Sequence, residues 1–221
     1  MDQLKQTTTQ PRPYNDHKDI ERFSLRERLV HWTVAVSFVY LMLSGLALYF
    51  PRLYWIASLL GGGTTIRVWH PYVGVVFIVA FTIMFYPWKR CMLLYPEDWE
   101  WLRNIWSYIT HRDKTLPEIG RFDPGQKIFF WLMASAGVLL FVSGIPLWFP
   151  DKFSWNVRLV SIFTHEVAST AAIAGIIAHI YMGTIGVPGA LSAMTRGKVT
   201  QEWAKTHHAR WYRRLKEKGI I

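Results

Sequence analysis

The sequence predicts an all-α membrane protein, built as a bundle of four transmembrane helices. Of its 221 residues, 51% are hydrophobic and only 18% are charged. The charged residues are gathered between four stretches that hold almost none, and about 20 apolar residues suffice for a helix to cross a hydrocarbon core. We therefore predict four membrane spans, at Leu29–Phe50, Val68–Trp88, Ile128–Pro150 and Leu159–Val187.

These spans divide the chain into three parts. Residues 1–28 form a polar N-terminal segment, residues 29–187 the membrane domain, and residues 188–221 a basic tail with several aromatic residues. No short apolar segment with a small-residue cleavage site precedes the first span, so we expect that span to be retained. We find no internal repeat along the chain.

The distribution of basic residues orients the spans. Lys and Arg number 21 in residues 1–28, 89–127 and 188–221, against 4 in the two remaining connections. Because basic residues are enriched on the cytoplasmic side of a membrane, we predict a multi-pass protein of the bacterial inner membrane with both termini in the cytoplasm. The same segregation argues against nucleic-acid binding, which the net charge of +10 alone would allow.

The connection between the second and third spans contains a predicted surface helix. Pro96 and the two acidic residues that follow it suit the first turn of a helix. Apolar side chains then recur at helical spacing, at Trp99, Leu102, Trp106 and Ile109. We expect this cytoplasmic helix to lie at the level of the lipid headgroups.

Histidine is the residue type that carries the chemistry of the chain. Cys91 is the only cysteine, which excludes an internal disulfide, an iron–sulfur cluster and a covalently attached CxxCH haem. Four of the histidines lie outside the spans, where the simplest interpretation is a solvated or interfacial imidazole: His17, His111, His207 and His208.

The other four histidines lie in or at the spans, where ionisable groups are costly and usually functional. With the predicted orientation, His70 and His165 lie near the outer side, and His31 and His179 near the cytoplasmic side. The spacing of fourteen positions from His165 to His179 places both on one face of the last span, roughly 21 Å apart along its axis. Each therefore has a partner of similar depth on another helix.

Paired imidazoles from facing helices are the arrangement that bis-histidine ligation of haem b requires. With both axial positions filled, the iron has no open site and its role is electron transfer. We therefore predict two haems b, one at each level, with the four histidines as ligands of the haem iron. Glycines that would make room for the macrocycle lie near these levels, at Gly45, Gly74 and Gly175.

Other uses of these histidines fit the spacing less well. A zinc or copper site needs its ligands close together, and a proton relay needs polar groups between the levels, where only Ser169 and Thr170 occur. A haem-free membrane anchor stays as an alternative. Glu166, next to His165, is either a group that supports the outer ligand, a contact for water or a partner subunit, or an interfacial carboxylate.

Four long motifs connect the chain to a known family. They are "ERLVHWTVAVSFVYLMLSGLALYFP", "RVWHPYVGVVFIVAFTIMF", "GRFDPGQKIFFWLM" and "GKVTQEWAKTHHARWYRR". They resemble the gamma subunit of membrane-bound respiratory formate dehydrogenases, a cytochrome b556, and the similarity extends over about residues 22–215. Cytochrome b subunits of nickel–iron hydrogenases and of thiosulfate reductase are similar more distantly, and they supply the alternative function.

The resemblance implies a four-helix bundle with two haems b. His70 and His165 would hold the outer haem, and His31 and His179 the inner one, as the topology also predicts. In the family, a subunit with molybdenum or tungsten pterin oxidises formate outside the membrane. An iron–sulfur subunit passes the electrons to the outer haem, and the inner haem reduces menaquinone or ubiquinone on the cytoplasmic side. The chain would then be the quinone-reducing subunit of the complex and not the formate-oxidising one.

The resemblance also implies a quinone pocket at His179 and the start of the third span. The matching residues in "RFDPGQK" are Asp123, Gly125 and Gln126. The family often has asparagine where this chain has Asp123, and a carboxylate accepts hydrogen bonds but donates none unless it is protonated. Asp123 also suits the N-cap of a helix that has Pro124 at its first position, so capping and quinone binding both stay open.

Overall fold

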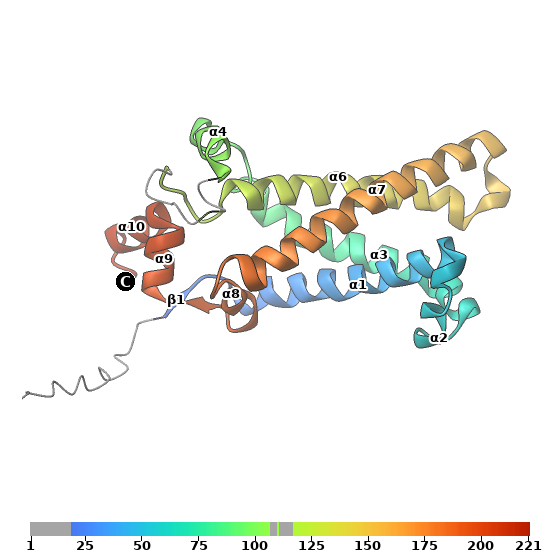
Figure 1. Ribbon diagram of the computed structural model, residues 1–221, viewed down its shortest axis with the longest axis horizontal. Coiled ribbons are helices and arrows are strands. Elements are labelled where there is room, and N and C mark those ends of the chain that lie inside the picture. Colours follow the sequence, from blue (N-terminus) through green and yellow to red (C-terminus); the bar gives the residue numbers. More distant parts are fainter. Residues whose placement is uncertain (1–18, 107–109, 111–116) are drawn as a thin grey trace, which may run out of the picture.

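Four long helices form the body of the protein in the computed structural model, which describes residues 19–106, 110 and 117–221 (Figure 1). Each helix is long and apolar enough to cross a membrane. The all-α class and the four apolar helices predicted from the sequence are thereby confirmed. The helices are α1 (Leu25–Tyr49), α3 (Gly63–Trp88), α6 (Pro124–Trp148) and α7 (Trp155–Tyr181), which continues into a π-helical turn, η4 (Met182–Gly186).

All four helices begin before the uncharged stretch that predicted them, and polar caps explain this for α1 and α6. At the start of α1, the Ser24 hydroxyl accepts a hydrogen bond from the Glu27 N–H at 3.3 Å, and the Glu27 carboxylate accepts one from the Ser24 N–H at 2.8 Å. Asp123 and Gln126 form the same reciprocal pair at the start of α6. Such pairs satisfy N–H groups that have no partner within the helix.

The helices are arranged as two antiparallel hairpins (Figure 1). α1 packs along α3, and α6 packs along α7, while a narrower contact between α3 and α6 joins the hairpins. α1 and α7 make few close backbone contacts with each other. At the far end of the bundle, the hairpins turn through η1 (Pro51–Leu53) and α2 (Ile56–Leu59), and through η3 (Pro150–Lys152).

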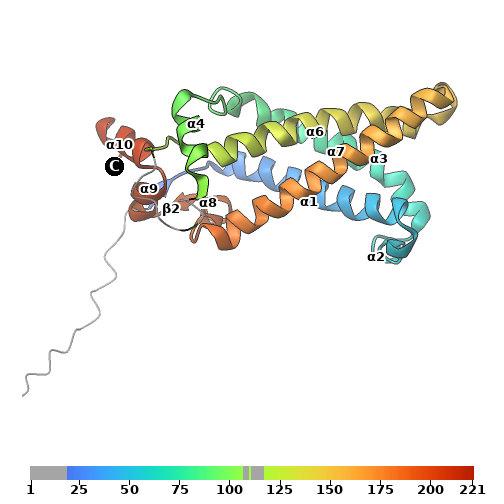
Figure 2. The same ribbon diagram turned by 45° about the horizontal axis from the view of Figure 1, so that its top comes forward.

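The opposite end of the bundle carries the shorter elements (Figure 2). β1 and β2 pair in antiparallel fashion with Ile20 opposite Val199, and so tie the residues before α1 to the tail. Both ends of the described chain therefore lie on one side of the bundle, as an even number of spans requires. The elements are β1 (Ile20–Glu21), α4 (Pro96–Arg103), α8 (Leu191–Thr195), β2 (Lys198–Val199), α9 (Gln201–His207) and α10 (Ala209–Glu217).

α4 is the helix predicted between the second and third spans, and it is shorter than the predicted stretch. A buried ion pair anchors it, since Lys127 Nζ of α6 lies 2.7 Å from the Asp98 carboxylate. The indoles of Trp99 and Trp106 are exposed. Ile109 lies outside the described residues, and the position of α4 at the headgroup level stays a prediction.

The outside of the bundle is apolar around the long helices. Examples of exposed side chains are Val76 and Val79 on α3 and Val138 and Val142 on α6. Monomeric soluble proteins rarely expose apolar patches of this extent, whereas hydrocarbon is a suitable solvent for them. The exterior thus agrees with a protein that lies in a membrane.

The two hairpins carry an internal repeat, which corrects the expectation that the chain has none. The end of α1 and the two residues after it read "LSGLALYFP" (43–51). The end of α6 and the two residues after it read "VSGIPLWFP" (142–150). The capped starts of α1 and α6 align in the same register, because Ser24 precedes Ser44 by the same number of positions, 20, as Asp123 precedes Ser143. The repeated motifs lie in α1 and α6, the first helix of each hairpin.

Candidate functional site: two histidine pairs in the helix bundle

Two pairs of histidines face each other inside the bundle. His70 of α3 and His165 of α7 lie toward the η1 and η3 end, with ring centroids 6.5 Å apart and ring planes at 54°. His31 of α1 and His179 of α7 lie toward the other end, with centroids 6.2 Å apart and planes at 50°. The structure brings together the same pairs that the depths of the four histidines predicted.

The spacing of both pairs suits one metal atom between two rings. An imidazole nitrogen binds a transition metal at about 2 Å, so two rings that coordinate one atom from opposite sides have centroids about 6 Å apart. Both pairs match this distance. Within the described residues, no group of three or more His, Cys, Asp or Glu side chains gathers at one point, so a metal atom at either pair would meet two imidazoles and no further side chain of these types.

We call His70 and His165 the outer pair, and His31 and His179 the inner pair, after the predicted orientation. Two serines hold the outer pair. Ser44 Oγ lies 2.8 Å from His70 Nδ1, and Ser143 Oγ lies 3.0 Å from His165 Nδ1. Both serines are buried, at 0% and 4% exposure, and they occupy equivalent positions in the repeat. These contacts engage Nδ1 of each ring, so Nε2 is the ring nitrogen that stays available to a ligand. The sequence analysis missed these serines, and the repeated Ser-Gly before Phe-Pro was the signal that could have found them.

The glycine after each serine lets the imidazole approach closely. A Cβ at Gly45 would lie 3.5 Å from Cε1 of the facing histidine, and a Cβ at Gly144 would lie 3.7 Å from Cε1 of the other. Gly45 is thus at the outer pair, as predicted. A Cβ at Gly74 would meet only open space, whereas one at Gly175 would lie 2.9 Å from Leu132. Gly175 therefore permits close packing of α6 against α7.

The inner pair is held differently. His31 Nδ1 is buried and has no hydrogen-bond partner, so this nitrogen is not engaged by a side chain of the protein. The ring of His179 stacks on Phe129 of α6, with centroids 4.4 Å apart and 4° between the planes. Aromatic and aliphatic packing orients these rings, in contrast to the serine contacts of the outer pair.

The profile of the prokaryotic cytochrome b561 family matches residues 22–197, a range that includes all four histidines. The chain belongs to this family. Haem b is the cofactor of a cytochrome b, and the two facing imidazole pairs at metal-bridging distance fit it.

Curated relatives resemble this cytochrome over most of its length. It is 36% identical to the formate dehydrogenase cytochrome b556(fdo) subunit of Escherichia coli K12 over 201 residues, which are 90% of this chain and 94% of the relative. It is 33% identical to the nitrate-inducible cytochrome b556(Fdn) subunit of the same strain over 203 residues, 90% and 93% of the two chains. It is 31% identical to the formate dehydrogenase cytochrome b556 subunit of Haemophilus influenzae over 189 residues, 84% and 79%. The resemblance drawn from the four motifs is confirmed.

The residues predicted for a quinone pocket lie at the start of α6 in this cytochrome. Asp123 is half-buried, and its carboxylate accepts a hydrogen bond from the Gln126 N–H at 2.8 Å. The Gln126 Oε1 accepts a hydrogen bond from the Asp123 N–H at 3.0 Å, and Gly125 is exposed. The capping role of Asp123 is therefore confirmed, and its role toward quinone stays a prediction. Phe129, further along α6, connects this start to the inner pair through its stack on His179.

A buried cation lies close to Asp123 and was missed in the sequence. Arg22 is 3% exposed, and its guanidinium lies over the indoles of Trp203 and Trp211, 4.9 Å and 5.2 Å from the ring centroids. Burial lowers the pKa of Arg22 to about 9. Burial also raises the pKa of the Asp123 carboxyl, although the Gln126 N–H and the nearby Arg22 charge act in the opposite direction.

His208 corrects the expectation that the histidines outside the spans are solvated or interfacial. It is 2% exposed, its Nδ1 donates to the Gly120 carbonyl at 2.7 Å, and its Nε2 accepts from Arg22 Nη2 at 2.9 Å. Burial and the Arg22 charge lower the pKa of His208 well below its usual value. His207 contacts Trp203, while His17 and His111 lie outside the described residues. The folded tail buries His208, and this tertiary contact leaves no local pattern in the sequence.

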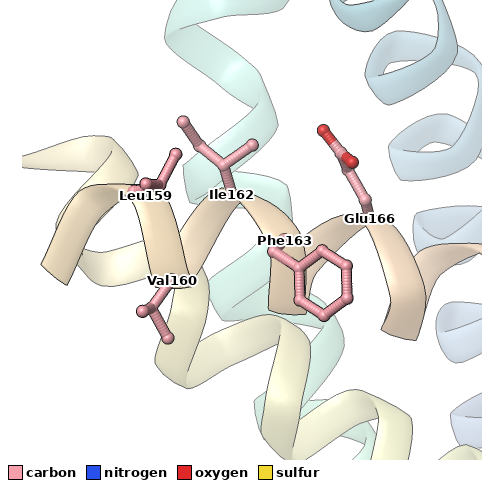
Figure 3. Close-up of a pocket in the computed structure, with 5 residues that line it drawn as sticks. All are labelled: Leu159, Val160, Ile162, Phe163 and Glu166. Carbon is pink, nitrogen blue, oxygen red and sulfur yellow. The ribbon is translucent and has the colours of Figure 1, made fainter. Parts of the chain in front are cut away.

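Glu166 is separate from both histidine pairs. It borders an apolar hollow on the outer face of α7, and Figure 3 shows its carboxylate on the same side of the helix as Ile162 and on the opposite side from Phe163. The group that interacts with it is the hydroxyl of Tyr49 at the end of α1. This favours an interfacial carboxylate over a group that supports His165. The hollow is lined by Leu159, Val160, Ile162, Phe163 and Glu166.

Proposed function

We propose that the chain is the cytochrome b membrane subunit of a respiratory formate dehydrogenase, with two haems b. It would accept electrons from an iron–sulfur subunit at the outer face and deliver them to menaquinone or ubiquinone near the cytoplasmic face. A separate subunit with molybdenum or tungsten pterin would oxidise formate. The main support is that two pairs of histidines face each other at two depths of the bundle. The similarity to formate dehydrogenase cytochromes over 90% of the chain supports it further.

The four histidines would provide all protein ligands of the iron. His70 and His165 would hold the outer haem, and His31 and His179 the inner one. Haem b held by two such imidazoles would supply one-electron transfer. The helices would hold the rings in position, and the stack of Phe129 on His179 would orient the ring of His179.

Asp123 would deliver the protons that quinone reduction consumes. A raised pKa means that this carboxyl holds its proton more firmly than an exposed aspartate does. In the protonated form it donates a hydrogen bond, as the asparagine that is frequent in the family would. With Gly125, Gln126 and His179, it would form the quinone pocket on the cytoplasmic side.

The charge distribution supports an inward path for the electrons. The described parts of the three basic segments lie at the end of the bundle that carries the tail and the inner histidine pair, and this end would lie in the cytoplasm of a bacterium. Electrons that enter near His70 and His165 would then move inward and add to the membrane potential without proton pumping.

The partner enzyme can be identified with the chain in its native membrane. We expect purification through a C-terminal tag to recover a pterin subunit and an iron–sulfur subunit, and formate to reduce the b-type absorption of the complex. Recovery with a hydrogenase or a thiosulfate reductase, the alternative partners, would contradict the formate assignment. A tagged chain that carries no haem after expression with ample haem would support a haem-free anchor.

The ligand pairs can be tested by single substitutions. We expect His31→Ala and His70→Ala each to remove one of two b-type components, and the component that remains to differ in potential between the two variants. Haem content per chain and equilibrium redox measurements of the absorption bands would show this. Thr33→Ala is the matched control, because Thr33 is exposed two residues from His31, and it should retain both components. Retention of two haems in both histidine variants would refute the pairing.

A further inference from the structure

The outer histidine pair is distinguished from the inner pair by its hydrogen bonds. Ser44 of α1 contacts His70 of α3, and Ser143 of α6 contacts His165 of α7, so each hairpin supplies both a serine and the histidine that it holds. His31 Nδ1 has no partner. Within the described part of the chain, no hydrogen bond to the His179 ring is found either. The difference between the levels is therefore built into the fold.

The direction of the two serine bonds follows from their other contacts. Ser44 Oγ lies 2.7 Å from the Tyr40 carbonyl oxygen, and Ser143 Oγ lies 2.6 Å from the Leu139 carbonyl oxygen. A carbonyl oxygen only accepts, so the single hydroxyl proton of each serine is directed to the carbonyl. The serine oxygen must then accept from the imidazole, and the proton of each neutral outer histidine lies on Nδ1.

This assignment has two chemical results. The lone pair of His70 and of His165 lies on Nε2, which is the form of the ring that binds a metal. An imidazole whose Nδ1–H donates a hydrogen bond is also a more basic ligand than one that donates none. A more basic axial ligand stabilises ferric over ferrous iron, which lowers the midpoint potential of the haem.

We infer that Ser44 and Ser143 are positioning residues that lower the potential of the outer haem relative to the inner one. They act through the ring nitrogens of His70 and His165 and touch no substrate. The lower potential at the outer level favours electron transfer toward His31 and His179, the direction of the proposed reaction. The inference rests on the proposed haem ligation, and its test is separable from the test of that ligation.

The experiment uses Ser44→Ala, Ser143→Ala and the double variant in the purified complex, with haem content and the potential of each b component as readouts. We expect full haem content and an upward shift of one component only, larger in the double variant than in either single variant. The component that shifts should be the one that survives in His31→Ala and is absent from His70→Ala.

Ser37→Ala is the matched control. Ser37 is buried in α1 and donates to the Thr33 carbonyl at 2.7 Å, as Ser44 does to Tyr40, but it contacts no histidine. It should leave both potentials unchanged. The inference is overturned if neither serine variant shifts a potential, if Ser37→Ala shifts it equally, or if the higher-potential component is the one that moves. Loss of the outer haem from a serine variant would overturn it too, since the hydroxyl would then be required for ligation. If His70→Ala retained both haems, the proposed ligation itself would fail.

Discussion

A single carboxylate at the start of α6 illustrates how one residue can combine a structural and a chemical role. Asp123 caps the helix through the Gln126 N–H, and burial raises the pKa of its carboxyl. Capping needs only an acceptor oxygen, whereas delivery of protons needs a group that gains and loses one near neutral pH. The two roles predict different results when the side chain is changed.

Replacement of Asp123 separates these roles. We expect Asp123→Ala to slow quinone reduction while formate still reduces the haems, because the outer histidine pair is distant from α6 Asp123. Asp123→Asn should slow quinone reduction less, because asparagine retains a side-chain oxygen and caps a helix nearly as well. Rates of haem reduction by formate and of quinone reduction, measured in the whole complex, provide the comparison.

Two results would contradict a role in quinone reduction. If Asp123→Ala lowered both rates and the haem content together, Asp123 would be a structural cap only. If neither rate changed, the quinone pocket would lie elsewhere.

At the scale of residues, the sequence predicted those site residues whose side chains are energetically costly to place in a membrane. The four histidines of the spans stood out because ionisable groups are rare there, and their pairs faced each other as their depths predicted. Ser44 and Ser143 did not stand out, because serine is common in membrane helices and bonds to its own backbone. Arg22 and His208 were missed because a tertiary contact, and no local pattern, buries them.

At the scale of elements, the existence of the helices was predictable and their starts were not. An uncharged stretch marks the part of a helix that lies in hydrocarbon, while the cap that begins the helix is polar and lies outside it. Ser24 and Asp123 show this for α1 and α6. α4 ends at Arg103, before the end of the predicted stretch. The spacing of its apolar residues predicted a helix but carried no signal for that end.

The docking of the tail should depend on pH. The pKa of His208 is lower in the folded tail than the value of about 6.5 for a free histidine, so the undocked tail binds a proton more readily. Docking is then unaffected above the free value and weakens as the pH falls below it. Limited proteolysis of the tail in membrane vesicles across this range would measure the effect.

His208→Gln provides the control for this prediction. Glutamine can both donate to the Gly120 carbonyl and accept from Arg22, but it does not titrate. Asp123 titrates with the opposite sign, because its pKa is raised and a fall in pH favours the folded form. Asp123 contributes equally in the parent and in His208→Gln. If His208→Gln kept the full acid sensitivity of the parent, His208 would be ruled out as the cause of that sensitivity.

At the scale of the whole molecule, four apolar helices and a strong charge bias define the topology. We expect a reporter that is active only outside the inner membrane to be silent at the C-terminus and active in the "GGGTT" segment (61–65), where the connection after α2 leads into α3. The physical reason is the count of 21 basic residues on one side against 4 on the other. The reverse pattern would place the inner histidine pair outside and invert the electron path.

The pairing of β1 with β2 has a consequence for how the protein is made. Ile20 leaves the ribosome early, while its partner Val199 is synthesised only after all four helices. The same holds for Arg22, whose partner His208 comes later still. The segment before α1 therefore waits without its partners until the last helix has been inserted, and the closure of this junction marks a completely inserted chain. A chain that stops before the tail lacks Val199 and His208, so Ile20 and Arg22 would stay without the partners that cover them in the complete fold.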